Sequence, residues 1–110
     1  MENGTISGNE AKIYGGGVYV EEGTFIMNGG TISGNTAPEG GGVYVGTDGI
    51  FIMNKGAIYG TNNPSMTNTV TDPDGGSALY VSGGGKYTID GISKTVSIGI
   101  NETFNNTISR

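Results

Sequence analysis

The residue types that most often perform chemistry in proteins are sparse in this chain. Its 110 residues include no cysteine and no histidine, so thiolate metal sites and the commonest general base are absent. The segment Asp72-Pro73-Asp74-Gly75 has the acidic residues of a calcium-binding loop, but calcium requires more oxygen ligands than two carboxylates provide. Proline followed by glycine is typical of a turn. We therefore expect no metal site and no cofactor.

The remaining acidic residues do not form a catalytic pattern. Glu21-Glu22, Glu39, Asp48 and Asp90 lie mainly at expected turns, and the single arginine is Arg110. Glycoside hydrolysis needs two carboxylates about 5 to 10 Å apart, and the spacing of these residues assigns no such pair. The sequence therefore predicts a protein that is not an enzyme and has no catalytic residues. A polysaccharide-active enzyme remains a lesser alternative.

Tyrosines recur at equivalent positions and could form a binding surface. A column of tyrosines offers apolar area with a polar tip, which suits a protein or a glycan partner. Outward-facing aromatic residues also stabilise stacked strands without any ligand. The predicted binding residues are this column, one nearby tyrosine and four residues of a polar segment: Tyr19, Tyr44, Tyr80, Tyr59, Asn63, Met66, Asp72 and Asp74.

A tandem repeat carries these side chains. The phrase Met27-Asn28-Gly29-Gly30-Thr31-Ile32-Ser33-Gly34-Asn35 has counterparts at Met1–Asn9 and, more loosely, at Met53–Gly60, with a period of 26 residues. The phrase Gly15-Gly16-Gly17-Val18-Tyr19-Val20 returns as Gly40-Gly41-Gly42-Val43-Tyr44-Val45. Such a period predicts a unit that buries its apolar face only by stacking on its copies.

Within each repeat, apolar residues alternate with small or polar ones and glycine or asparagine ends each run, which is typical of short strands joined by turns. Each strand should pair in parallel with its own copy, about 4.8 Å away. We predict one all-β domain over residues 1–110, a parallel β-helix with three sheets and about four coils. The coils cover about 1–25, 26–51, 52–87 with an insertion, and 88–110 as a shortened coil or cap.

The alternation also predicts which side chains face the interior. Ile6, Ile32 and Ile58 should be buried, whereas Thr5/Ser7 and Thr31/Ser33 should face outward. Asparagines at equivalent turns should stack as columns, one with Asn9 and Asn35 and another with Asn28, Asn54 and Asp90. About ten additional residues within Gly60 to Gly76 predict a protruding loop.

Charge and hydropathy limit the partners. The net charge of −5, with five scattered basic residues, argues against binding to nucleic acid or anionic membranes. No apolar stretch approaches the roughly 18 to 20 residues of a membrane span, and no signal-peptide pattern occurs. As written, the sequence predicts a cytoplasmic protein without membrane insertion.

The glycine-rich phrases Gly-Gly-Gly-Val-Tyr-Val and Gly-Gly-Thr-Ile-Ser-Gly-Asn, over about residues 1–92, resemble repeats of known proteins. They are similar to the right-handed parallel β-helix repeats of bacterial surface proteins and, more distantly, to those of chlamydial polymorphic outer-membrane proteins. The resemblance implies a right-handed helix and an adhesin-like, surface-exposed stalk exported as part of a longer parent.

We therefore predict a non-enzymatic binding or scaffold module that recognises a protein or a glycan. An alternative is a small acidic inhibitor from a phage or mobile element that blocks a host enzyme. A stacked fold also exposes an apolar end unless it is covered. We expect a homodimer or end-to-end stack through the first repeat, formed by Met1, Ile6, Ile13 and Val18.

Overall fold

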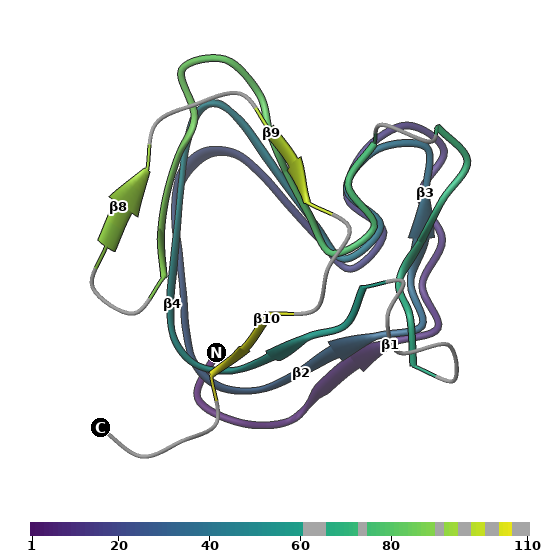
Figure 1. Ribbon diagram of the computed structural model, residues 1–110, viewed down its shortest axis with the longest axis horizontal. Coiled ribbons are helices and arrows are strands. Elements are labelled where there is room, and N and C mark those ends of the chain that lie inside the picture. The colour runs from purple at the N-terminus through teal and green to yellow at the C-terminus, as the bar shows by residue number, and fades with distance from the viewer. Residues whose placement is uncertain (61–65, 73–74, 90–91, 95–97, 101–103, 107–110) are drawn as a thin grey trace.

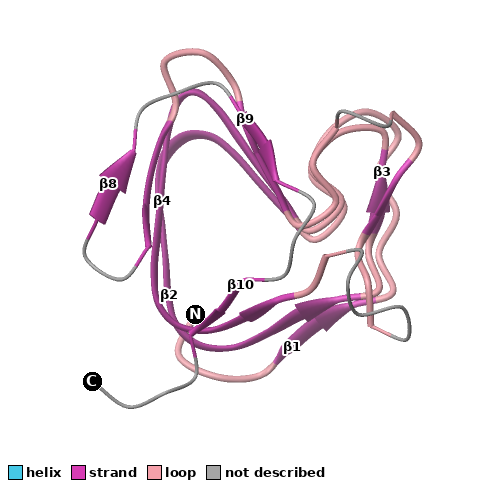
Figure 2. Cartoon of the chain, viewed as in Figure 1, coloured by secondary structure: helices cyan, strands magenta, loops and turns pink. Residues whose placement is uncertain are grey.

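The computed structural model describes residues 1–60, 66–72, 75–89, 92–94, 98–100 and 104–106. These residues form strands and connecting loops without a helix, so the predicted all-β class is confirmed (Figure 2). In the same residues there is accordingly no helix long and apolar enough to cross a membrane. The strands are β1 (Thr5–Ser7), β2 (Val18–Ser33), β3 (Thr36–Ala37), β4 (Val43–Ile58), β5 (Thr69–Val70), β6 (Leu79–Val81), β7 (Lys86–Ile89), β8 (Ile92–Lys94), β9 (Ile98–Ile100) and β10 (Phe104–Asn106).

Equivalent segments of successive repeats pair in parallel and in register. β1 pairs with the end of β2, where Ile6 is opposite Ile32. The long strands β2 and β4 pair along most of their length, and β4 pairs in turn with β6 and β7. Viewed down the shortest axis, β2 and β4 trace nearly the same bent path (Figure 1). The predicted parallel pairing of each segment with its own copy is therefore confirmed for these strands.

Glycines allow the paired segments to turn and to approach closely. Gly30 and Gly56 occupy equivalent bends with φ of 92° and 107°, a backbone conformation that side chains disfavour. At Gly42, a Cβ atom would lie 2.6 Å from the carbonyl oxygen of Ala78 on the neighbouring segment. The glycine triplets thus let the backbone of one repeat lie directly against the next.

The core lies between the inward faces of the long strands. Ile32 and Ile58 are fully buried and Ile6 packs against them, as the alternation predicts. Ser33, however, is buried rather than exposed. The carbonyl of Ile32 accepts a hydrogen bond from the amide of Tyr59, and the amide of Gly34 donates one to the carbonyl of Met66, so the segments that contain Tyr59 and Met66 lie beside Ser33.

Three asparagines, of which Asn35 and Asn68 are buried, form a ladder across three neighbouring segments. The Nδ2 atom of Asn9 donates to Oδ1 of Asn35 at 3.0 Å, and Nδ2 of Asn35 donates to Oδ1 of Asn68 at 2.9 Å. The predicted Asn9–Asn35 pair is therefore confirmed and extended by Asn68. The second predicted column is confirmed between Asn54 and Asn28, at 2.7 Å, whereas Asp90 lies outside the described residues.

Part of the predicted protruding loop is incorporated into the fold. Asn68 is fully buried, and β5 pairs in parallel with β3, so Thr69 lies opposite Thr36. The prediction of one loop spanning Gly60 to Gly76 is wrong in this respect. Asn68 occupies the position of Asn9 and Asn35, and hydrogen bonding of its side chain to Ile32 and Tyr59 holds the segment in place.

The C-terminal strands interrupt the parallel pattern. β8 pairs antiparallel with β7, β9 with β6, and β10 with β4. These strands therefore do not add a further turn of parallel pairing. β9 and β8 thereby form hydrogen bonds with the backbone groups of β6 and β7 that face away from β4. β8 lies outside the path of the long strands (Figure 1).

Candidate functional site: a tyrosine groove

A shallow groove of about 300 Å³ lies where β2 and β4 begin. We call it the tyrosine groove. It is formed by aromatic rings, two carboxylates, hydroxyl groups and one glycine, contributed by segments that are far apart in sequence. Its lining residues are Tyr14, Tyr19, Glu21, Tyr44, Gly46, Thr47, Asp48 and Ser82.

The tyrosine column differs from the predicted one in its first member. The backbones of Tyr19, Tyr44 and Tyr80 are in register, and the rings of Tyr44 and Tyr80 stack at 5.2 Å with an interplanar angle of 6°. The other face of Tyr44 is covered by Tyr14, at 4.2 Å and 25°. Tyr19 instead meets Tyr44 edge-on at 75°. Sequence spacing missed Tyr14 because this residue lies outside the recurring triplet.

This arrangement makes the tyrosines unequal as contact residues. Tyr44 lines the groove and is not part of the core cluster, as its predicted outward direction requires, but the neighbouring tyrosines leave it only 8% exposed, whereas Tyr19 is 44% exposed. The burial of Tyr44 raises the pKa of its hydroxyl, an effect partly opposed by hydrogen bonding with Ser82. The accessible aromatic surface of the groove is therefore largely that of Tyr19, with Tyr14 half-buried beside it.

The hydroxyl of Tyr19 is directed toward an acidic neighbour. It donates a hydrogen bond of 3.5 Å to Oε1 of Glu21. Desolvation, followed by the charge of Glu21, raises the pKa of Tyr19 above its ordinary value of 10.0. The tyrosine therefore remains a neutral hydrogen-bond donor near neutral pH.

The fold brings Glu21 and Asp48 to one groove, although their spacing in sequence gave no reason to pair them. The cause is an irregularity in the pairing of β2 with β4. Val20 pairs with Val45 and Glu22 with Asp48, so β4 accommodates one additional residue at this point. The bulge displaces the following residues of β4 relative to β2. Periodicity alone could not reveal this juxtaposition.

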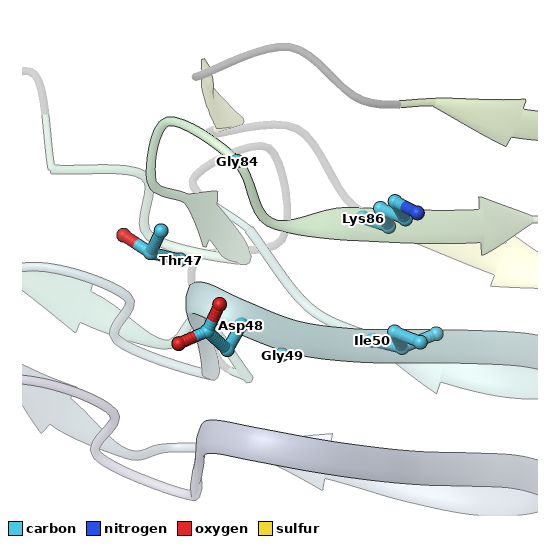
Figure 3. Close-up of a pocket in the computed structure, with 6 residues that line it drawn as sticks. All are labelled: Thr47, Asp48, Gly49, Ile50, Gly84 and Lys86. Atoms are coloured by element: carbon cyan, nitrogen blue, oxygen red, sulfur yellow. The ribbon is translucent and has the colours of Figure 1, made fainter.

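A second, smaller depression adjoins the groove. It has a volume of about 210 Å³ and shares Thr47 and Asp48 with the tyrosine groove. Lys86 also lines it, but its side chain extends along β7, away from the Asp48 carboxylate (Figure 3). Within the described residues, no ion pair joins Asp48 to Lys86.

The other predicted binding residues are not part of the tyrosine groove. Tyr59 is half-buried, and its carbonyl accepts two hydrogen bonds from Asn68. Met66 and Asp72 are exposed but do not line the groove. Asn63 and Asp74 lie outside the described residues. The structure therefore brings together Tyr19 and Tyr44, with Tyr80 stacked behind Tyr44, and separates them from the polar segment.

The residues predicted for self-association lie on the first repeat. Ile13 is 60% exposed, whereas Met1, Ile6 and Val18 are partly buried and pack against the core. On the outer side of β2, β1 reaches only Thr31–Ser33, and no other described strand pairs there. The first part of β2 is therefore an open edge.

The groove provides aromatic contact, hydroxyl donors and negative charge. The residues that the structure describes include no cluster of three acidic, histidine or cysteine side chains that could hold a metal ion. Fold and site thus define an all-β chain with a parallel sheet and an acidic, aromatic groove. Comparisons with protein-family models, curated proteins and solved structures found no match.

Proposed function

We propose that this chain is a non-enzymatic binding or scaffold module, built as a right-handed parallel β-helix, whose tyrosine groove recognises a protein or a glycan. The observation that carries the proposal is the groove itself, in which the exposed Tyr19 ring, the Tyr19 hydroxyl and two carboxylates face the same volume. Tyrosines provide contact area at a low cost in conformational entropy, and neighbouring polar groups orient a ligand.

The β-helical part of the proposal rests on the in-register parallel pairing of β1, β2, β4 and β6. It also rests on the asparagine ladder, because side-chain amides bond along such a stack only when equivalent turns are superimposed. The resemblance to bacterial surface repeats supports a surface-exposed or adhesin-like role for the parent protein.

Direct binding measurements test the groove. An immobilised glycan panel and a defined peptide panel would be probed with the wild-type chain and with Tyr19→Ala. Because Tyr19 supplies most of the exposed aromatic surface, we expect Tyr19→Ala to weaken binding at least about tenfold, the size expected for loss of an aromatic contact residue.

Ile26→Ala is the matched control, because Ile26 lies on the same strand, is also 44% exposed and does not line the groove. Far-ultraviolet circular dichroism should show an unchanged fold for both variants. Equal binding by Tyr19→Ala and wild type would refute the groove as the binding site.

The shared position of Glu21 and Asp48 makes the enzyme alternative testable as well. Two carboxylates in one groove are the minimum requirement for glycoside hydrolysis. Incubation with acidic and neutral polysaccharides should yield no product with the wild-type chain. Steady product release that Asp48→Asn abolishes would replace the binding proposal with an enzymatic one.

The inhibitor alternative would require instead that the chain blocks a purified basic enzyme at stoichiometric concentration.

A further inference from the structure

The charges of the tyrosine groove favour one class of ligand. Glu21 and Asp48 both line the groove, and none of the lining residues is basic. Lys86 lines the adjoining depression, and its side chain extends away from Asp48 (Figure 3). The two carboxylates therefore create a negative potential that the groove itself does not neutralise.

The aromatic side chains add a second, independent preference for a cation. A ring face attracts cations through its quadrupole, and tyrosine beside a carboxylate combines this attraction with direct charge pairing. Tyr19 is the exposed ring, and its hydroxyl bonds to Glu21, so ring and carboxylate are held together. The ring of Tyr44 stacks with the rings of Tyr14 and Tyr80, and this stack forms the aromatic wall of the groove behind Tyr19.

The same observations favour an organic cation over a metal ion as the ligand of the groove. Calcium and similar ions require six or more oxygen ligands, and the described residues contain no suitable cluster of acidic side chains. A guanidinium group has different requirements. It is planar, stacks on an aromatic ring and donates several hydrogen bonds to carboxylates at once.

We propose that the tyrosine groove binds an arginine side chain of a polypeptide partner, with the guanidinium against Tyr19 and paired with Glu21 and Asp48. The inference rests on the proposed binding function and specifies its ligand. The net charge of −5 is complementary to a basic partner segment. A glycan, which carries no such cation, is the competing outcome.

The test uses two small probes of nearly the same shape, of which only one carries the guanidinium charge and its full set of hydrogen-bond donors. Binding of a capped arginine peptide, Ac-Gly-Arg-Gly-NH2, would be followed by nuclear magnetic resonance shifts of the tyrosine rings and compared with its citrulline counterpart. Citrulline keeps the shape of arginine but is neutral. We expect arginine to bind at least about tenfold more tightly than citrulline, and its affinity to fall as salt is raised.

Matched variants then test whether arginine binding depends on the carboxylates of the groove or on the net charge of the chain. Glu21→Gln and Asp48→Asn should each weaken arginine binding about five- to tenfold. Glu22→Gln changes the net charge equally but lies outside the groove, and should have little effect. Equal losses in all three variants would indicate a general charge effect and overturn the inference.

The remaining outcomes separate the two proposals. One outcome is that neutral oligosaccharides bind, that Tyr19→Ala abolishes this binding, and that the arginine peptide does not bind. The groove would then be a glycan site, and the arginine inference would be wrong while the proposed function stands. If arginine and citrulline bind equally, the charge argument fails. If neither peptide nor oligosaccharide shifts the tyrosine resonances at millimolar concentration, both proposals are overturned.

Discussion

At the scale of single residues, Asn35 connects three segments of the chain. Its side chain accepts hydrogen bonds from the backbone and amide nitrogens of Asn9, and donates to Oδ1 of Asn68 and to the carbonyl of Ile6. Asn35 is fully buried, so water cannot replace these bonds. A residue that is polar in sequence thus acts as part of the interior.

We predict that Asn35→Ala lowers the free energy of unfolding by at least about 2 kcal/mol, because several buried groups lose their partners at once. Asn9→Ala, at the exposed end of the ladder, should cost less than about 1 kcal/mol. Urea unfolding monitored by circular dichroism measures both. Similar losses in the two variants would show that the ladder does not depend on its buried centre.

At the scale of elements, close approach between segments explains the glycine triplets. A Cβ atom on Gly42 would lie 2.6 Å from the oxygen of Ala78 and 2.8 Å from Cγ2 of Ile58. These atoms belong to the backbone of the next segment and to the core, so neither can move without separating the paired strands. A Cβ atom on Gly83, by contrast, would face open space, with no other atom within 4 Å.

We predict that Gly42→Ala destabilises the protein by about 1 to 3 kcal/mol, the usual cost of overpacking a close contact. Gly83→Ala should change stability by less than about 0.5 kcal/mol. Thermal unfolding of the two variants tests the difference. An unaltered midpoint for Gly42→Ala would contradict the close approach of the segments around Gly42 and Ala78.

At the scale of the whole molecule, the two ends differ. Near the C-terminus, antiparallel strands pair with β4, β6 and β7, whereas the first part of β2 has an edge to which no described strand pairs. We propose that a second copy of the chain covers this edge. Two copies that meet through this same edge would form a closed two-fold dimer rather than an extended stack.

We predict that sedimentation analysis detects a dimer whose population rises with concentration. Ile13→Glu should shift the equilibrium to monomer by placing a charge on the exposed side of the first repeat. Met66→Glu, also at an exposed apolar residue but away from that edge, is the control. A wild-type chain that stays monomeric up to millimolar concentration would exclude the dimer.

Much of the parallel architecture was predictable because its cause is local repetition. Ile6, Ile32 and Ile58 alternate with small or polar residues at equivalent positions, and that pattern alone predicts parallel pairing of copies with isoleucine inside. The insertion was harder to interpret. Asn68 follows Ile58 by ten residues rather than three, so its membership in the asparagine ladder was not visible from spacing.

The sequence by itself determined the strand class, the parallel register and the inward isoleucines, because these depend on short periodic patterns. Only the tertiary structure decided that Tyr14 stacks on Tyr44, that Ser33 is covered, and that Glu21 and Asp48 share a groove. Those contacts join residues outside the recurring phrases or across a bulge, where a shift of one residue redirects the side chains.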